Sequence, residues 1–255
     1  MRDLDSWAPK PEKPALEEDE IHIWRAYLDC DETLLRRFES TLASDERLRA
    51  DRLYHQRDRN DFVATRGILR ELLGVYLDSC PGHLEFDYNT RGKPFLRTGS
   101  MQRPVQFNVS HSRGLALLAF AKSRHLGVDV ELVRPEFAVD ELAGRYFSPQ
   151  EVTELRSLPP SLRADGFFLC WTRKEAYVKA RGEGLYIPLE SFNVSLTPGQ
   201  PERLESADNL NWSLRSIHPD SRYVGALVAE GVGWRLRYWD WEPALGNRRA
   251  KTITN

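Results

Sequence analysis

Two segments of the chain carry acids and lysines at a spacing that could bind a metal ion and a phosphate. The first reads GVDVE at residues 127–131. Its apolar surroundings predict a strand, and because alternate side chains of a strand share a face, Asp129 and Glu131 should project the same way. Two like charges held side by side need a cation near them, or one of them is protonated. This strand is therefore a candidate for binding a divalent metal ion.

The second segment, WTRKEAYVKA at residues 171–180, predicts a helix because its apolar residues recur at helical spacing. Glu175 falls four residues after Trp171 on the apolar stripe, and Lys179 lies one turn further on. A carboxylate that faces the interior needs a partner, since an unpaired buried charge costs several kcal/mol. A metal shared with the two acids of the first segment would meet that need, while Lys174 and Lys179 could hold a phosphate.

Each of these signals alone has an ordinary explanation. An Asp-x-Glu pair in a strand is commonly solvated, and motif matches of this kind have a high false-positive rate. Glu175 and Lys179 could form a surface salt bridge that stabilises the helix by only a few tenths of a kcal/mol. The presence of both segments, with Glu175 on the apolar stripe, favours the metal site.

Length and composition set the broad class. The chain has 255 residues, of which 41% are hydrophobic and seven are Trp, enough for one large domain or two small ones with a substantial core. Its net charge is −2 and its pI about 6.3, so no overall basic field attracts nucleic acid or anionic membranes. The N-terminus lacks the order of a signal peptide, and no apolar run has the length of a membrane span. We expect a soluble, cytoplasmic protein without a membrane or nucleic-acid partner.

The three cysteines, Cys30, Cys80 and Cys170, are far apart and lack the close spacing of a zinc site. We expect them to be reduced thiols, with Cys170 in the core.

Alternating and helical patterns predict strands and long helices in both halves of the chain, which is typical of an α+β protein. Strands are expected at 21–27, 105–112, 115–121, 126–133, 192–196, 212–217, 223–229 and 234–239, and helices from Ser44, over 60–77, from Ser148 and around Trp171. The expected domains are a mobile tail (1–19), an N-terminal subdomain (20–125), a C-terminal subdomain with the metal ligands (126–244) and a second tail (245–255).

Two basic features outside these segments could also bind a phosphate. Arg66 lies on the apolar face of the predicted helix 60–77, where an arginine either extends to the edge of the core or holds a phosphate. Residues 89–94 read NTRGKP, a loop in which a glycine between two cations lets the backbone approach a phosphate closely. The alternative for the loop is an ordinary basic turn.

Four motifs together resemble the 4′-phosphopantetheinyl transferases. They are FNVSHS at 107–112, GVDVE at 127–131, FSPQE at 147–151 and WTRKEAYVKA at 171–180, in the order and approximate spacing of that family. The length resembles the larger monomeric type, similar to the enzymes that activate surfactin synthetase and related assembly lines of secondary metabolism. The likeness covers about residues 21–240. It implies two similar α+β subdomains, a pseudo-dimer, each a small antiparallel sheet packed on a long helix, with the active site between them.

The resemblance also implies a reaction and its site. The phosphopantetheine arm of coenzyme A would pass to a serine of an apo acyl or peptidyl carrier protein in a Mg²⁺-dependent transfer that releases 3′,5′-ADP. The implied Mg²⁺ ligands are Asp129, Glu131 and Glu175, and Lys179 would be the lysine of the active-site helix. The proton of the acceptor serine would go to Glu175 or to a metal-bound water, and we favour Glu175.

Several further residues are implied as coenzyme A contacts: Ser110 and His111, the loop residues Arg91, Gly92, Lys93 and Pro94, and, on looser motifs, Arg49 and Arg66. At Glu46 an acid replaces a basic residue found in some relatives, so contacts at the adenine end could differ.

Two other functions remain open from the sequence. A Mg²⁺-dependent nucleotide phosphohydrolase would use the same acids with water as the nucleophile, but it would leave the basic loop 89–94 and the four ordered motifs unexplained. A catalytically silent binding module would have no need to keep all three acids.

Overall fold

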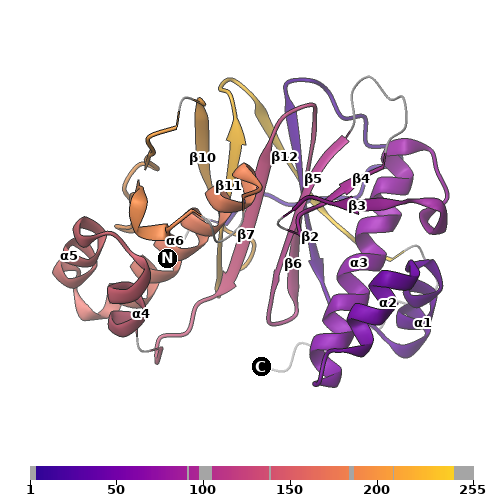
Figure 1. Cartoon of the computed structure of the whole chain (residues 1–255), viewed down its shortest axis with the longest axis horizontal. Coiled ribbons are helices and arrows are strands. Elements are labelled where there is room, and N and C mark those ends of the chain that lie inside the picture. Colours follow the sequence, from indigo (N-terminus) through magenta and orange to yellow (C-terminus); the bar gives the residue numbers. More distant parts are fainter. Residues whose placement is uncertain are drawn as a thin grey trace.

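The computed structural model describes residues 4–90, 92–97, 105–137, 139–183, 187–208 and 210–243. Two sheets pack face to face in the centre, and a long helix covers the outer face of each (Figure 1). The order of layers is therefore helix, sheet, sheet, helix, and the predicted α+β class is confirmed. The two covering helices, α3 (Gln56–Leu77) and α6 (Pro160–Arg181), are each 22 residues long.

The N-terminal half contributes most of a five-stranded sheet. Its strand order is β1 (Ala8–Pro9), β12 (Arg235–Asp240), β2 (Glu20–Tyr27), β6 (Leu115–Lys122) and β5 (Val105–Ser112). Helix α3 lies on this sheet, with α1 (Glu32–Thr41) and α2 (Ser44–Asp51) beside it and a hairpin of β3 (Phe86–Tyr88) and β4 (Pro94–Leu96) at its edge. A short 3-10 helix, η1 (Pro81–His83), joins α3 to the hairpin.

The C-terminal half forms the second layer. Its three-stranded sheet has the order β10 (Trp212–Ile217), β11 (Tyr223–Glu230) and β7 (Leu126–Leu132), and α6 packs across it. The smaller elements α4 (Val139–Tyr146), α5 (Pro149–Ser157), η3 (Leu189–Ser191), β8 (Asn193–Val194) and β9 (Leu204–Glu205) surround α6.

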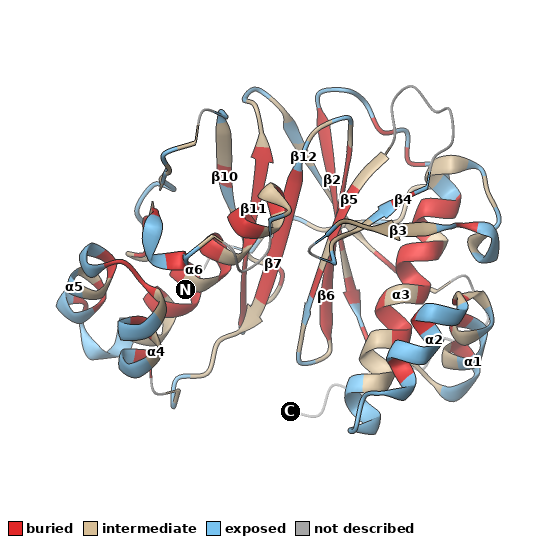
Figure 2. Ribbon diagram, in the orientation of Figure 1, coloured by how far each residue is buried: buried red, intermediate tan, exposed pale blue. Residues whose placement is uncertain are grey.

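The core lies where the two sheets meet, and this explains the continuous apolar sequence of β6. Leu117 faces the second sheet while Leu118 faces α3, and both are fully buried. A strand covered on both faces needs apolar residues at every position rather than at alternate ones. The strands at the centre of the molecule are accordingly buried along most of their length (Figure 2).

Most predicted elements are present, with shifts at their ends. The strand at Trp212–Ile217 has the expected bounds. Helix α3 begins at Gln56 instead of residue 60, and only Asn193–Val194 of the expected strand 192–196 are extended and paired. The three cysteines are free thiols, and Cys170 is buried as expected. None of the helices among the described residues combines the length and apolarity needed to cross a bilayer.

Strand β12 does not lie in the half of the protein where it is expected. Strand β12 was assigned to the C-terminal subdomain, but it pairs in parallel with β2, with Trp239 opposite Trp24. The five-stranded sheet is therefore mixed, not antiparallel as expected. Parallel pairing between strands so far apart in sequence leaves no local signal, since it depends on neither a turn nor a hairpin.

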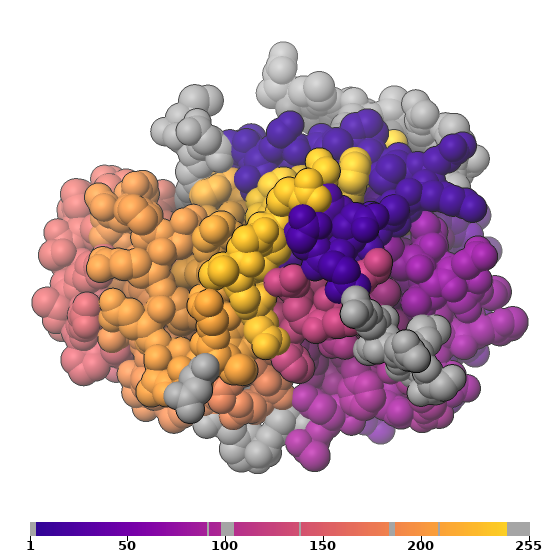
Figure 3. All heavy atoms as spheres, turned by 90° about the horizontal axis from the view of Figure 1, so that it is seen from above, coloured from indigo at the N-terminus to yellow at the C-terminus, as the bar shows by residue number. Residues whose placement is uncertain are grey.

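The N-terminal segment also differs from the expected free tail. Among residues 4–19, Ala8–Pro9 pair with β12, the Trp7 ring contacts Tyr238 at 5.1 Å between ring centres, and Leu16 is only 6% exposed. Figure 3 shows this indigo segment lying against the yellow C-terminal strand. A large part of this segment is thus packed on the body of the protein.

Candidate active site

Strand β7 presents the first two acids to α6. Alternation along the strand places Val128 and Val130 in the core between the sheets, so Asp129 and Glu131 face the opposite side, as predicted. Asp129 is only 4% exposed, and Glu131 is half-buried.

Gly127 lets the helix approach this strand. A side chain there would overlap the Ala176 carbonyl oxygen and the Ala180 nitrogen and lie 2.8 Å from the Lys179 carbonyl carbon. The backbones of β7 and α6 therefore touch at this point, one turn from Glu175. Gly127 belongs to the GVDVE motif, but the motif alone assigns it no role. A glycine inside a strand, two residues before an acid, is a signal for close approach of another backbone.

Asp129 is held by a lysine and a serine. Its Oδ1 accepts hydrogen bonds from Lys179 Nζ at 2.6 Å and Ser110 Oγ at 2.7 Å. Lys179 Nζ also donates to Ser110 Oγ at 3.0 Å. Asp129 Oδ2 is buried and has no hydrogen-bond partner among the described residues. A buried carboxylate oxygen without a partner is costly, so this atom is suited to receive a ligand.

The three acids lie close enough to affect one another's ionisation. Burial raises the pKa of Glu131, and the charge of Asp129 raises it further. Burial also raises the pKa of Glu175, and the charges of Asp129 and Glu131 add to this, while Lys179 opposes it. The structure thus brings together the three acids and Lys179 predicted from sequence.

Carboxylate oxygens are the kind of ligand that Mg²⁺ prefers. Among the described residues, no group of three or more acids, histidines or cysteines is placed so that it could hold a metal ion by itself. Mg²⁺ seldom uses such a cage, because it binds one or two carboxylates, keeps several waters and takes the rest of its oxygens from substrate phosphates. The unpartnered Asp129 Oδ2, with one of the nearby carboxylates of Glu131 and Glu175, would supply the protein ligands of such an ion, and the third acid would lie close to it.

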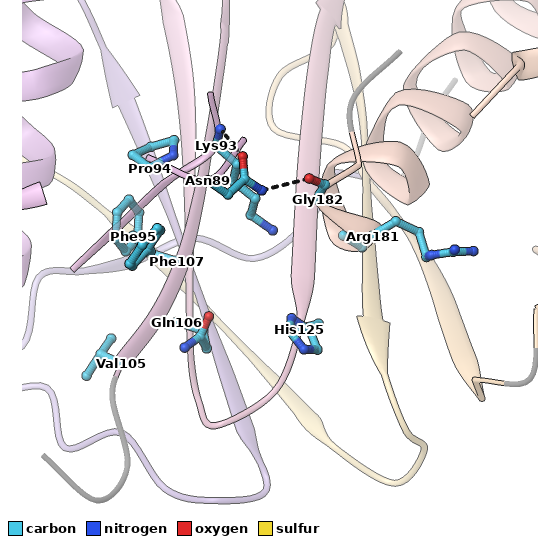
Figure 4. Close-up of a pocket in the computed structure, with 11 residues that line it drawn as sticks. Asn89, Lys93, Pro94, Phe95, Val105, Gln106, Phe107, His125, Arg181 and Gly182 are labelled. Carbon is cyan, nitrogen blue, oxygen red and sulfur yellow. Dashed lines mark hydrogen bonds between the residues drawn. The ribbon is translucent and has the colours of Figure 1, made fainter. Parts of the chain in front are cut away.

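The basic loop binds the end of α6 (Figure 4). Lys93 Nζ donates to the carbonyl oxygens of Lys179 at 2.6 Å and Leu126 at 3.0 Å, and Asn89 Nδ2 donates to Gly182 O at 2.7 Å. A cation at the carbonyl end of a helix is favourable. The hairpin of the N-terminal half is thus attached to the helix that carries Glu175 and Lys179. Asn89, which sequence reasoning did not select, is part of this attachment.

Lys93 is electrostatically strained in this position. Burial, together with the nearby Lys179 charge, lowers the pKa of Lys93 from 10.5 to about 8. An ammonium group has three donors, and two of them contact carbonyl oxygens, so one remains for another acceptor. The charge of Lys179 disfavours that of Lys93, so an anion bound beside Lys93 would stabilise its ammonium group.

Two cavities border the site. The one in Figure 4 has a volume of about 300 Å³ and includes Lys93, but none of the three acids lines it. A smaller cavity of about 120 Å³ is bordered by Glu131, Arg134 and aromatic side chains that include Phe168 and Trp171. Of the three acids only Glu131 lines the smaller cavity, so a substrate held beside Glu131 would meet this cavity.

Lys174 is not part of the site, contrary to expectation. Its side chain is fully buried and its Nζ lies 2.7 Å from Glu151 Oε2, with further hydrogen bonds to the carbonyl oxygens of Leu189 and Phe192. Lys174 therefore joins α5 and the loop before β8 to α6. The motif put Lys174 next to Glu175, but adjacent residues of a helix point in directions about 100° apart.

The two arginines proposed on looser motifs differ from each other. Arg66 Nε donates to Glu46 Oε1 at 2.5 Å, and Glu46, which is 1% exposed, also pairs with Arg70. Arg66 is thus engaged inside the N-terminal half, which argues against its expected phosphate contact. Arg49 is exposed, lies over the rings of Phe62 and Tyr88, and has no acid within ion-pair distance among the described residues.

The remaining predicted contacts lie near the acids or in the loop. His111 is exposed on β5, next to the buried Ser110. Gly92 is exposed with a positive φ of 81°, and Pro94 lines the cavity of Figure 4. Arg91 lies outside the described residues.

Acids and lysines gathered at the junction of two helix–sheet layers are the kinds of groups that phosphoryl transfer uses. Comparisons with known proteins identify the family. A model of the 4′-phosphopantetheinyl transferase superfamily matches residues 125–228, and a model of the 4′-phosphopantetheinyl transferase N-terminal region matches residues 30–123. The chain belongs to the 4′-phosphopantetheinyl transferase superfamily.

Individual proteins are similar to this chain to different extents. The 4′-phosphopantetheinyl transferase HetI of Nostoc sp. (strain PCC 7120) is 44% identical over 234 residues, which cover 92% of this chain and 98% of the relative. The 4′-phosphopantetheinyl transferase Sfp of Bacillus subtilis (strain 168) is 28% identical over 194 residues, 76% of this chain and 84% of Sfp. A crystal structure of a holo-(acyl-carrier-protein) synthase from Bacillus anthracis in complex with CoA (3′,5′-ADP) is similar with a TM-score of 0.35 and 21% identity, over 42% of this chain and 94% of that one.

Proposed function

We propose that this enzyme transfers the 4′-phosphopantetheine arm of coenzyme A to a serine of an apo acyl or peptidyl carrier protein, with Mg²⁺, and releases 3′,5′-ADP. The observation that carries the proposal is the buried Asp129, whose Oδ1 binds Lys179 while its Oδ2 has no partner among the described residues. The membership of the family and the names of its relatives support the reaction. A monomeric, cytoplasmic enzyme remains our prediction.

Different residues of this chain would have different roles in the transfer. Bound Mg²⁺ would neutralise charge on the pyrophosphate oxygens of coenzyme A. Lys179 and Lys93 supply further positive charge, and His111 and Arg49 remain candidate contacts for the other phosphates. The serine oxygen forms the new bond to phosphorus as the bond to the 5′-phosphate of the leaving 3′,5′-ADP breaks. Glu175, with its raised pKa, accepts the serine proton.

The apolar cavity beside Glu131 favours this reaction over phosphate hydrolysis. A phosphohydrolase needs only a water molecule on the far side of the phosphorus. Walls such as Phe168 and Trp171 instead suit a substrate with an uncharged, partly apolar arm next to its phosphate, as in coenzyme A.

Intact mass spectrometry tests the proposal. Several apo carrier proteins are incubated with the enzyme, coenzyme A and Mg²⁺, and a parallel sample contains EDTA. We expect one phosphopantetheine arm to be added to serine only when the metal is present, and the carriers to be ranked by rate. Hydrolysis of coenzyme A or nucleotides, with every carrier left unmodified, would support the phosphohydrolase instead.

The pH dependence of coenzyme A binding tests the role of Lys93. Because its pKa is about 8, Lys93 loses its charge as the pH rises through that value. We expect the KM for coenzyme A to increase above this pH, by up to about tenfold per pH unit if binding requires the charge. Unfolding would not explain the change. The folded pKa is lower than the unfolded one, so the contribution of this group to stability increases with pH between the two values.

A Lys93→Met variant is the control for this pH effect. Its KM should already be raised at pH 7 and should lack the additional increase above pH 8. A wild-type KM that stays constant from pH 7 to pH 9.5 would show that Lys93 does not contact the phosphates.

A further inference from the structure

The edges of the two sheets meet along β5 and β7. Strand β5 is the last strand of the five-stranded sheet and β7 the last of the three-stranded sheet, and the two are not paired as ladder partners. The side chain of Asn108 connects the two strands, because its Oδ1 accepts a hydrogen bond from the Val128 N–H at 2.9 Å. Asn108 is only 7% exposed, so this bond satisfies a backbone donor away from water.

Two serines continue this connection on the same face of β5. Ser110 Oγ donates to Asp129 Oδ1 at 2.7 Å, and Ser112 Oγ donates to Glu131 Oε2 at 2.7 Å. Residues 108, 110 and 112 alternate along the strand and therefore point to one side. We call these three side chains the polar ladder. Its first member holds the backbone of β7, and the other two hold the candidate metal ligands.

A backbone hydrogen bond sets the direction of the Ser112 hydroxyl. Its oxygen accepts a hydrogen bond from the Leu132 N–H at 3.3 Å, so its proton is available for Glu131. The hydroxyl thus connects one residue of β7 to the carboxylate of the preceding one. A half-buried carboxylate held in this way keeps one oxygen directed at Ser112 and presents the other elsewhere.

We propose that Ser112 is a positioning residue for metal binding: anchored on the Leu132 N–H, it orients the Glu131 carboxylate before the ion arrives. The inference rests on the proposed function, in which Glu131 is a metal ligand. Residues that hold a ligand in this way usually affect metal affinity by about 10- to 100-fold. The N-terminal half, through β5, would thereby control a metal site whose three acids all belong to the C-terminal half.

A pair of nearly isosteric variants isolates the hydroxyl. Ser112→Thr keeps it and Ser112→Val lacks it, and both side chains are β-branched and suited to a strand. Each protein is titrated with Mn²⁺ in the presence of coenzyme A and without a carrier protein, and free Mn²⁺ is followed by electron paramagnetic resonance. We expect the dissociation constant of Ser112→Thr to stay within a few-fold of wild type and that of Ser112→Val to rise about tenfold or more.

Equal Mn²⁺ affinity of the Thr and Val variants would overturn the role of Ser112. Ser112→Ala, which only removes a hydroxyl at a half-buried position, gives the same comparison against wild type if the valine variant does not fold. Ser213→Ala is the control: it removes a 2.7 Å hydrogen bond to Gly231 O in another hairpin, and its Mn²⁺ affinity should not change.

The same titration separates this inference from the proposed function. If wild type neither binds Mn²⁺ nor needs a metal for transfer, the metal site itself is rejected, and the inference with it. If wild type binds Mn²⁺ and the Val variant binds it equally well, only the positioning role of Ser112 is rejected.

Discussion

Glu175→Gln should abolish transfer without destabilising the protein. The amide keeps the size of the side chain but can neither accept the serine proton nor contribute charge to a metal site. General-base catalysis is worth about 10²- to 10⁴-fold, so kcat should fall by at least that factor. Intact mass spectrometry of the carrier protein over time, at saturating coenzyme A and Mg²⁺, measures the loss of kcat.

The stability of this variant should equal or exceed that of wild type. Burial and the charges of Asp129 and Glu131 raise the pKa of Glu175, so its ionised form is disfavoured in the folded state. A raised folded pKa means that this group's contribution to stability decreases as the pH rises through the window from its unfolded pKa of 4.5 to its folded one. A neutral side chain avoids this cost at neutral pH.

The control for this experiment is Glu141→Gln, on the exposed side of α4, which should leave both activity and unfolding unchanged. If Glu175→Gln transfers at the wild-type rate, Glu175 is not the base. If it loses activity only because it is unfolded, as judged by circular dichroism and thermal melting, the split between activity and stability predicted here is wrong.

Gly127→Ala should strongly lower the free energy of unfolding. The new methyl group would overlap backbone atoms of Ala176 and Ala180, which cannot move without displacing α6 from β7. Overpacking of a core typically costs about 1–3 kcal/mol, and contacts with backbone rather than side chains put this site at the upper end of that range. Because the same shift moves Glu175 and Lys179 away from Asp129, activity should fall even at temperatures where the variant is folded.

Gly144→Ala provides a matched control with the opposite sign. Gly144 lies inside α4, and a methyl group there meets no atom within 4 Å. Alanine is a better helix former than glycine, so the free energy of unfolding should increase by about 0.4–1 kcal/mol. Urea titrations of both variants measure these effects. A Gly127→Ala variant as stable as wild type would show that β7 and α6 do not touch at this point.

The local part of the site was predictable from sequence, because it depends on periodicity. Alternation in β7 places Asp129 and Glu131 on one face, and helical spacing in α6 places Glu175 and Lys179 one turn apart. The four ordered motifs then identified the family, which the comparisons confirm. The positions of the acids within β7 and of Glu175 and Lys179 within α6 depend only on residues close to them along the sequence.

The partners that the sequence does not reveal are far apart along the chain. Lys174 is expected at the cofactor because it stands next to Glu175 in the motif. Its real partners are Glu151, 23 residues upstream, and backbone carbonyl oxygens, and neither has a sequence signal. The expected phosphate contact of Arg66 stays a prediction, but its pairing with Glu46 depends on how α2 packs against α3 and has no sequence signal. A charge near an active-site motif has no sequence signature that distinguishes a ligand contact from a buried ion pair.

The return of β12 to the first sheet bears on how the protein is made. Strand β2 needs residues 235–240 as its neighbour, and β1 in turn pairs with β12. Because a protein is synthesised from its N-terminus, β2 is made long before residues 235–240, and the sheet is complete only after those residues have been made. Contacts of such sequence separation form late because the loop they close is long. Cutting the gene between residues 125 and 126 would therefore leave an N-terminal piece in which the β2 edge that pairs with β12 is exposed.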